Sequence, residues 1–87
     1  MSSNLLEPRD LLRQVLCHMV DDPSAVRIEG HEAGHIAVFD VHVAYDDMGK
    51  VLGRGGANAE AIRHLFGAIY RKYGKRLHIQ VVAPSRR

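Results

Sequence analysis

Tryptophan is absent from this sequence, cysteine occurs once, and the aromatic side chains are limited to three tyrosines and two phenylalanines. The single thiol, Cys17, excludes an intrachain disulfide and agrees with a reducing compartment. No apolar run approaches the roughly 18 residues that a membrane-spanning helix needs, and the N-terminus lacks the basic and then apolar order of a signal peptide. We therefore expect a cytoplasmic protein that does not enter a membrane.

The chain is also short. A domain of 87 residues buries only roughly 60 to 65% of the surface that its unfolded chain exposes, so a deep catalytic cleft is hard to build. Neither a Ser-His-Asp arrangement nor a Walker-type phosphate loop is recognisable. We expect one domain over residues 9–83, between a flexible segment 1–8 and a basic tail 84–87, with no enzymatic activity and no cofactor.

Charge is distributed unevenly along the chain. Residues 1–48 contain three basic and nine acidic side chains, a net charge of −6, whereas residues 49–87 contain nine basic side chains and one acidic, a net charge of +8. Evenly mixed charge would serve solubility equally well. The segregation therefore indicates that a polyanion binds to the C-terminal half.

The stretch HEAGH, residues 31–35, matches the His-Glu-x-x-His signature of zinc proteases. That signature works on an α-helix, where residues four apart share a face and both imidazoles reach one Zn²⁺. Here Gly30, Gly34 and the strand-like alternation on both sides favour a hairpin connection over residues 30–35. We therefore expect no metal site, and retain adventitious metal binding and a zinc hydrolase as alternatives.

The hydrophobic periodicity predicts six elements in the order α-β-β-α-α-β. The third strand follows the second through both later helices, so their pairing should be parallel. This pattern predicts an α+β fold with a three-stranded sheet and the helices on one face. The expected bounds are helix 8–20, strand 25–30, strand 35–44, helix 47–52, helix 57–73 and strand 76–82.

The same periodicity predicts which side chains face the core. In the first helix and the strands, they are Leu12, Val15, Leu16, Met19, Val26, Ile28, Ala37, Phe39, Val41, Val43, Leu77, Ile79 and Val81. In the long helix, the predicted apolar stripe is Ile62, Leu65, Phe66, Ile69 and Tyr73.

The stretch GRGG, residues 53–56, lies between two predicted helices. Glycine permits positive φ and lets a ligand approach the backbone with no Cβ in the way. A glycine-rich turn before a helix presents free N–H groups and the positive end of the helix dipole, which suits a phosphate. A plain helix–helix turn is the alternative, but the position at the head of the basic half favours a phosphate site.

These features resemble the K homology (KH) domain, whose Gly-x-x-Gly loop clamps about four nucleotides, in its type II arrangement. The stretches VDDPSAV, DMGKVLGRGG, AIR and YGKRLHIQVV are similar, in the same order, to the small bacterial KhpA-type RNA-binding proteins. The resemblance covers most of residues 10–82.

This resemblance implies that the chain binds single-stranded RNA, as a post-transcriptional regulator or RNA chaperone. The loop would hold phosphates, and Val51, Leu52 and Ile62 would form an aliphatic groove floor for bases, although each also suits the core. The implied RNA contacts are Lys50, Val51, Leu52, Gly53, Arg54, Gly55, Gly56, Asn58, Ile62 and Arg63.

The sequence departs from the family pattern just after the loop. Family members often carry basic residues there, whereas this chain has Ala57 and Glu60, and the loop contains no aromatic residue for stacking. We therefore expect weak, salt-sensitive binding with little sequence specificity.

The resemblance also implies protein partners. The family is described as pairing with itself and with a second, Jag-type KH protein, so a homodimer and such a partner are expected. The alternative function is accordingly a protein-interaction domain with little RNA binding of its own.

Overall fold

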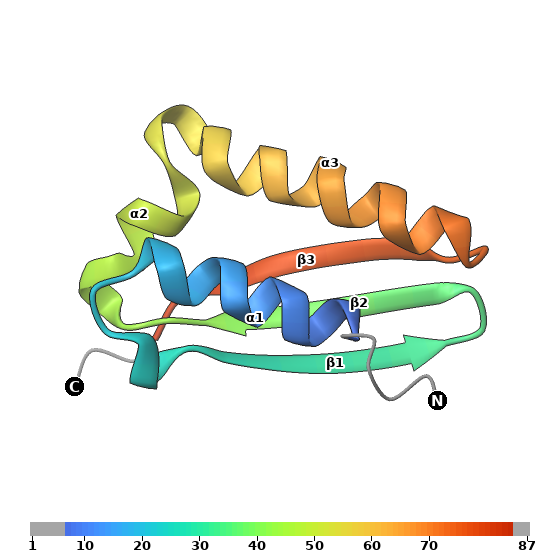
Figure 1. The fold of residues 1–87 in the computed structure, drawn as a ribbon, viewed down its shortest axis with the longest axis horizontal. Helices are drawn as coiled ribbons and strands as arrows, with labels where there is room; N and C mark the ends of the chain where they lie inside the picture. The colour runs from blue at the N-terminus through green and yellow to red at the C-terminus, as the bar shows by residue number, and fades with distance from the viewer. Residues whose placement is uncertain (1–6, 85–87) are drawn as a thin grey trace.

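The computed structural model describes residues 7–84, so most of the two predicted terminal segments lies outside the described residues. The order α-β-β-α-α-β is confirmed (Figure 1). No helix within residues 7–84 is long and apolar enough to cross a membrane. The elements are α1 (Pro8–Met19), β1 (Arg27–Ala33), β2 (Ile36–His42), α2 (Met48–Leu52), α3 (Ala57–Lys72) and β3 (Arg76–Val82), with single 3₁₀ turns at Pro23–Ala25, Tyr45–Asp47 and Arg54–Gly56.

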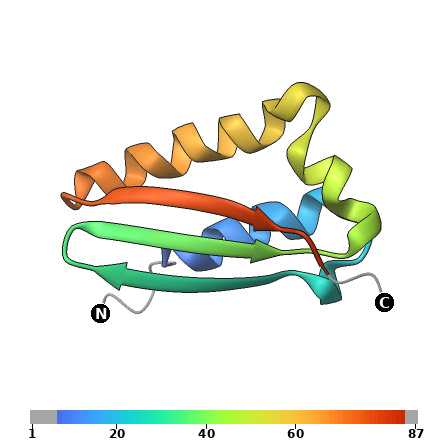
Figure 2. The same cartoon turned by 180° about the vertical axis from the view of Figure 1, so that it is seen from behind.

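The three strands form one mixed sheet in the order β1-β2-β3. β1 pairs with β2 in antiparallel register from Arg27 opposite His42 to Ala33 opposite Ile36. β3 pairs with β2 in parallel, as predicted, because the chain crosses over through α2 and α3. The helices lie on one face of the sheet, and the view from behind shows the strands in front of α1 (Figure 2). No strand within residues 7–84 pairs with the other side of β3, which we call its free edge.

The apolar stripe of α1 faces the sheet as predicted, and Pro8 occupies its first turn. Leu12 and Leu16 are buried, and Val15 and Met19 pack against the core at its margin. Phe39 of β2 meets Tyr70 of α3 edge to face, with ring centroids 5.7 Å apart. The buried apolar residues are Leu12, Leu16, Val26, Ala37, Phe39, Val41, Val43, Val51, Ala59, Phe66, Tyr70 and Ile79.

The predicted stripe of α3 is wrong at two positions. Leu65 and Tyr73 are 58% and 63% exposed, whereas Ala59 and Tyr70 are buried. The residues facing the sheet lie at 59, 62, 66 and 70, a spacing of three or four that keeps one line along the helix. Leu65 is one residue off that line, and Tyr73 follows the last helical residue.

The predicted hairpin connection over residues 30–35 is too long. Strand pairing continues to Ala33 opposite Ile36, so the turn contains only Gly34 and His35. Gly30 belongs to β1, where a Cβ would come within 3.1 Å of the Phe39 ring. It is therefore a site of close packing under an aromatic ring and not a turn.

Candidate functional site

Residues 53–56, the glycine loop, join α2 to α3 (Figure 1). Gly53, Gly55 and Gly56 have φ values of +77°, +62° and +81°, which cost a residue with a Cβ about 1–3 kcal/mol each. At Gly53 a Cβ would also lie 2.7 Å from the backbone nitrogen of Asn58. Glycine is therefore required at Gly53 by both backbone conformation and space.

The helices on either side of the loop are tied to each other. The Asn58 Nδ2 donates to the Lys50 carbonyl oxygen at 2.9 Å, and the Gly53 N–H donates to the carbonyl of Gly49 at 2.9 Å. The tip of the loop is open: no hydrogen-bond acceptor within residues 7–84 is in range of the backbone N–H groups of Arg54 and Gly55. These two donors face solvent on a fixed support.

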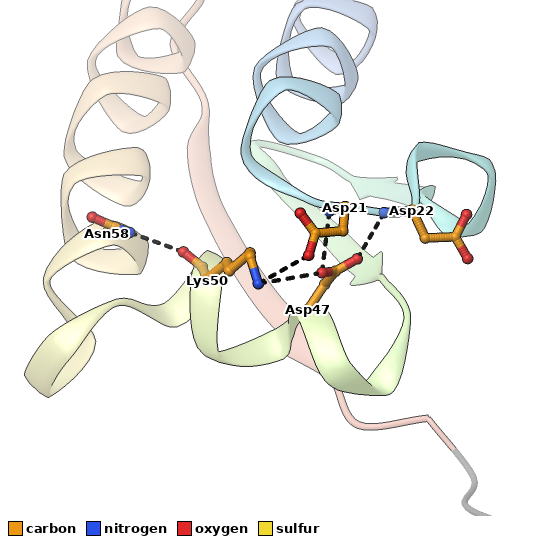
Figure 3. A network of polar contacts seen from close by, with 5 residues as sticks. All are labelled: Asp21, Asp22, Asp47, Lys50 and Asn58. Atoms are coloured by element: carbon orange, nitrogen blue, oxygen red, sulfur yellow. Dashed lines mark hydrogen bonds and ion pairs between the residues drawn. The ribbon is translucent and has the colours of Figure 1, made fainter.

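Two cations flank the tip, and they differ in their partners. Arg54 is exposed and forms no ion pair with any other residue that the structure describes. Lys50 is held by two carboxylates, with its Nζ 3.3 Å from Asp21 Oδ2 and 3.9 Å from Asp47 Oδ1 (Figure 3). The charge of Lys50 is therefore partly compensated, whereas that of Arg54 is available.

Asp47 anchors this end of the molecule. It is only 2% exposed, and its two carboxylate oxygens accept the backbone N–H groups of Asp21 at 3.1 Å and Asp22 at 3.0 Å (Figure 3). Since Asp47 directly precedes α2, these bonds fix α2 against the turn after α1. The glycine loop extends from the other end of α2, so its position depends on this anchor.

An apolar crevice lies between the helices and the sheet, and its lining includes Val51 and Ala59 from the two helices that the loop joins. Its volume is only about 10 Å³, enough for roughly one water molecule. Its lining residues are Leu12, Leu16, Val41, Val51, Ala59, Ile62, Arg63, Ile79 and Val81. A base could pack over the mouth of this crevice but could not enter it without displacing side chains.

Arg63 forms the polar rim of the crevice. Its Nε donates to the carbonyl oxygen of Ile79 in β3 at 3.3 Å, and its Nη1 lies 3.9 Å from Glu60 Oε1. The guanidinium therefore lies across the free edge of β3. It donates to a carbonyl of an edge strand that has no fourth strand beside it in the described part of the chain.

The predicted site residues thus lie around one end of the molecule but in different surroundings. Val51, Ile62 and Arg63 line the crevice, whereas Leu52 is half-buried and does not. Asn58 supports the loop through its bond to Lys50.

The sequence did not identify the two residues that hold Lys50 or the crevice residues of β3. Asp21 and Asp47 are 26 residues apart, and no local pattern pairs them. Ile79 and Val81 were predicted only as inward-facing strand residues. The parallel pairing of β3 was the one available signal that they would lie beside α3.

The HEAGH segment does not form the helical face that a zinc protease uses. His31 lies in β1, with its Nε2 3.6 Å from Asp40 Oδ2, while His35 lies in the turn. Glu32 Oε1 is 3.0 Å from the Nζ of Lys75. Within residues 7–84, no three His, Cys, Asp or Glu side chains are grouped so as to hold a metal ion.

Comparison with known proteins agrees with this architecture. Residues 9–81 match the family model described as "KhpA/KhpB, KH domain". The chain is 32% identical over 74 residues to the RNA-binding protein KhpA of Halalkalibacterium halodurans, covering 85% of this chain and 97% of that protein. It is 37% identical over 73 residues to the RNA-binding protein KhpA of Mycobacterium leprae, covering 84% and 88%. With matches over most of its length, the chain belongs to the KhpA/KhpB family of KH domains.

Proposed function

We propose that this protein binds single-stranded RNA through the glycine loop. The observation that carries the proposal is the open tip, where two backbone N–H groups and the guanidinium of Arg54 lie together without a partner among residues 7–84. N–H groups converging before a helix suit a phosphate oxygen. The relatives' name, RNA-binding protein KhpA, supports RNA as the source of that phosphate.

In this proposal the loop holds the backbone and the crevice receives the bases. The loop binds phosphates at Arg54 and Gly55, while one or two bases pack over the half-buried Ile62, with Arg63 at the rim. Val51, only 1% exposed, lines the crevice from the core side. A crevice of about 10 Å³ offers little shape to distinguish one base from another. Binding is therefore tolerant of sequence, which would suit an RNA chaperone or post-transcriptional regulator.

The test compares RNA binding by the native chain and a loop variant. The variant carries Arg54→Asp and Gly55→Asp, because Gly55 has open space around a Cβ and Asp tolerates positive φ better than most residues. Binding of a mixed single-stranded RNA pool is measured at two salt concentrations, after circular dichroism has verified the fold. We expect salt-dependent binding by the native chain and loss of at least about tenfold in affinity in the variant.

A matched control makes the same chemical change at another turn. Ser24 and Arg27 are exposed at and just after the Pro23–Ala25 turn, so Arg27→Asp with Ser24→Asp introduces equal charge away from the loop. This control should reduce affinity far less than the loop variant does. Equal binding by the native chain and the loop variant, or no RNA binding by the native chain, would refute the proposal.

A protein-interaction role is the second candidate, favoured by two large apolar side chains that α3 and its end leave exposed. Leu65 and Tyr73 are 58% and 63% exposed. They could contact a second copy of this chain or another KH protein, and two loops on one particle would raise avidity. Sedimentation with and without RNA distinguishes this role, which predicts an assembly that forms without RNA.

A further inference from the structure

A line of hollows continues from the crevice along the free edge of β3. The first, of about 590 Å³, runs beside β3 from Val81 to Leu77. The second, of about 820 Å³, extends past the C-terminal end of α3 to the hairpin turn at His35. Both share Arg63, Leu77 and His78, and Arg63 also lines the crevice. We call this continuous surface the α3–β3 track.

The track carries charge of one sign. Every ionisable side chain that lines its two hollows is a cation or a histidine: Arg63, Arg71, Lys75, Arg76, His35 and His78. Lys75 is paired with Glu32 at 3.0 Å, and Arg63 lies near Glu60. Arg71 and Arg76 are exposed and form no ion pair with any residue of the described range 7–84. Two uncompensated guanidinium groups therefore lie beyond the glycine loop.

The surface of α3 is flattened between these cations. Gly67 lies in the middle of the helix, where glycine is less favourable than alanine by about 1 kcal/mol. Only the Arg71 guanidinium is near a Cβ built there, at 3.6 Å, so packing does not require glycine. Gly67 is half-buried, and the Arg71 guanidinium folds back over it. The space that a side chain would fill at this position is therefore taken by a cation that can meet a phosphate.

We propose that RNA held by the glycine loop continues along the α3–β3 track and contacts Arg71 and Arg76 through its phosphates. The proposal rests on the proposed RNA binding and extends it from about four nucleotides to a longer strand. Arg71 lies eight residues beyond Arg63, about 12 Å along the helix, so short oligonucleotides would not reach it. The cationic lining favours a phosphate backbone over an apolar protein segment.

The test uses fluorescently labelled uridine oligonucleotides of two lengths, 5 and 12 nucleotides. We expect the native protein to bind the longer one more tightly. Arg71→Glu with Arg76→Glu should weaken binding of the 12-mer about tenfold and reduce its salt slope by about 1.4, because each phosphate contact contributes about 0.7. Binding of the 5-mer should change less than about twofold.

Two further variants separate contact from net charge. Arg13→Glu with Arg27→Glu makes the same charge change away from the track and should affect both lengths alike. Gly67→Met blocks the flattened surface without changing charge, and should weaken the 12-mer several-fold while sparing the 5-mer.

The proposal is overturned if the Arg71 and Arg76 variant binds the 12-mer as the native chain does, or loses both lengths equally, as the control would. It is also overturned if the native chain binds the two lengths with equal affinity. The loop variant of Arg54 and Gly55 reports separately on the proposed function: retained 5-mer binding by that variant would refute the loop site whatever the track does.

Discussion

Two glycine-containing motifs in this chain resemble functional sites, and their surroundings differ. The glycine loop has three residues with positive φ and an arginine without a described partner. In the hairpin segment 31–35, Gly34 alone has positive φ. Its Glu32 is 3.0 Å from Lys75 Nζ, and its His31 is 3.6 Å from Asp40. Glu32 and His31 of the hairpin are directed at neighbouring side chains, while the polar groups of the loop tip have no partner in the part of the chain that the structure describes.

The difference shows that a motif acquires its chemistry from the element that contains it. Four-residue spacing brings two histidines together on a helix, but places them apart in a strand and a turn. Glycines between two helices, in contrast, produce an exposed turn with free donors. The variants below test whether the two motifs differ in stability and charge as the structure indicates.

The largest effect is expected from Gly53→Ala. The new Cβ would meet the Asn58 backbone nitrogen at 2.7 Å at a φ of +77°, and both strains add in the native state. We expect a loss of about 3 kcal/mol in the free energy of unfolding, measured by urea denaturation. RNA binding should fall with it, because the same clash displaces the start of α3.

Gly34→Ala is the matched change in the hairpin. Gly34 has a similar φ of +61° but nothing lies within 4 Å of the added Cβ. The substitution therefore costs only the strain of positive φ, about 1 kcal/mol in the free energy of unfolding. Gly34→Asn should cost less than Gly34→Ala, since asparagine accepts positive φ. Equal losses at Gly53 and Gly34 would mean that neither the close approach of Asn58 nor the ψ of 172° at Gly53 adds to the cost of positive φ.

The second-largest loss of stability is expected from removing a carboxylate, either Asp47 before α2 or Glu32 in the hairpin. Asp47→Ala would remove the acceptor of two backbone N–H groups at 3.1 and 3.0 Å and leave them in a half-buried turn, at a cost of about 2 kcal/mol. Glu32→Ala should cost less than about 1 kcal/mol, because its pair with Lys75 is partly exposed. Chemical denaturation of both variants measures this contrast, and a larger loss at Glu32 would reverse it.

The order of helices and strands was predictable because it depends on local periodicity, and β3 matched its predicted bounds of 76–82. The bounds of the hairpin were not predictable. Gly30 resembles a turn residue in the sequence, but it lies in β1, where the ring of Phe39, nine residues away, leaves little room for a side chain. Likewise, the apolar stripe of α3 includes Tyr70, which packs against the sheet, and not Tyr73, which follows the last residue of the helix and is exposed.

The candidate site also combines features that the local sequence predicts with contacts that depend on the folded structure. The glycine loop and Arg54 were identified because their chemistry is contained in one short stretch. The sequence could not show that Lys50 is held by Asp21 and Asp47, since those contacts depend on how α1 and α2 meet (Figure 3). A predicted RNA contact therefore has less free charge than its neighbour Arg54.

A smaller effect should follow from releasing that lysine. Asp21→Asn removes the carboxylate 3.3 Å from Lys50 Nζ but keeps the backbone N–H that Asp47 accepts. We expect RNA affinity to rise about two- to threefold, in line with the strength of an exposed ion pair, measured by fluorescence polarisation. Asp46→Asn makes the same charge change at a residue that does not contact Lys50. An equal gain in affinity there would show that the gain comes from the lower negative charge of the protein and not from the release of Lys50.

The smallest effect is expected from Tyr70, which lies beside Glu32 under the hairpin. Burial, and then the charge of Glu32, raises the pKa of the Tyr70 hydroxyl above its usual 10. Between that value and the raised folded-state pKa, the unfolded chain loses the proton first, so stability is complete below pH of about 10 and falls as pH rises further. Unfolding by urea across this window should show a smaller alkaline loss in Tyr70→Phe than in the native chain. An identical loss would mean that other groups control it, and that the hairpin glutamate does not act on this hydroxyl.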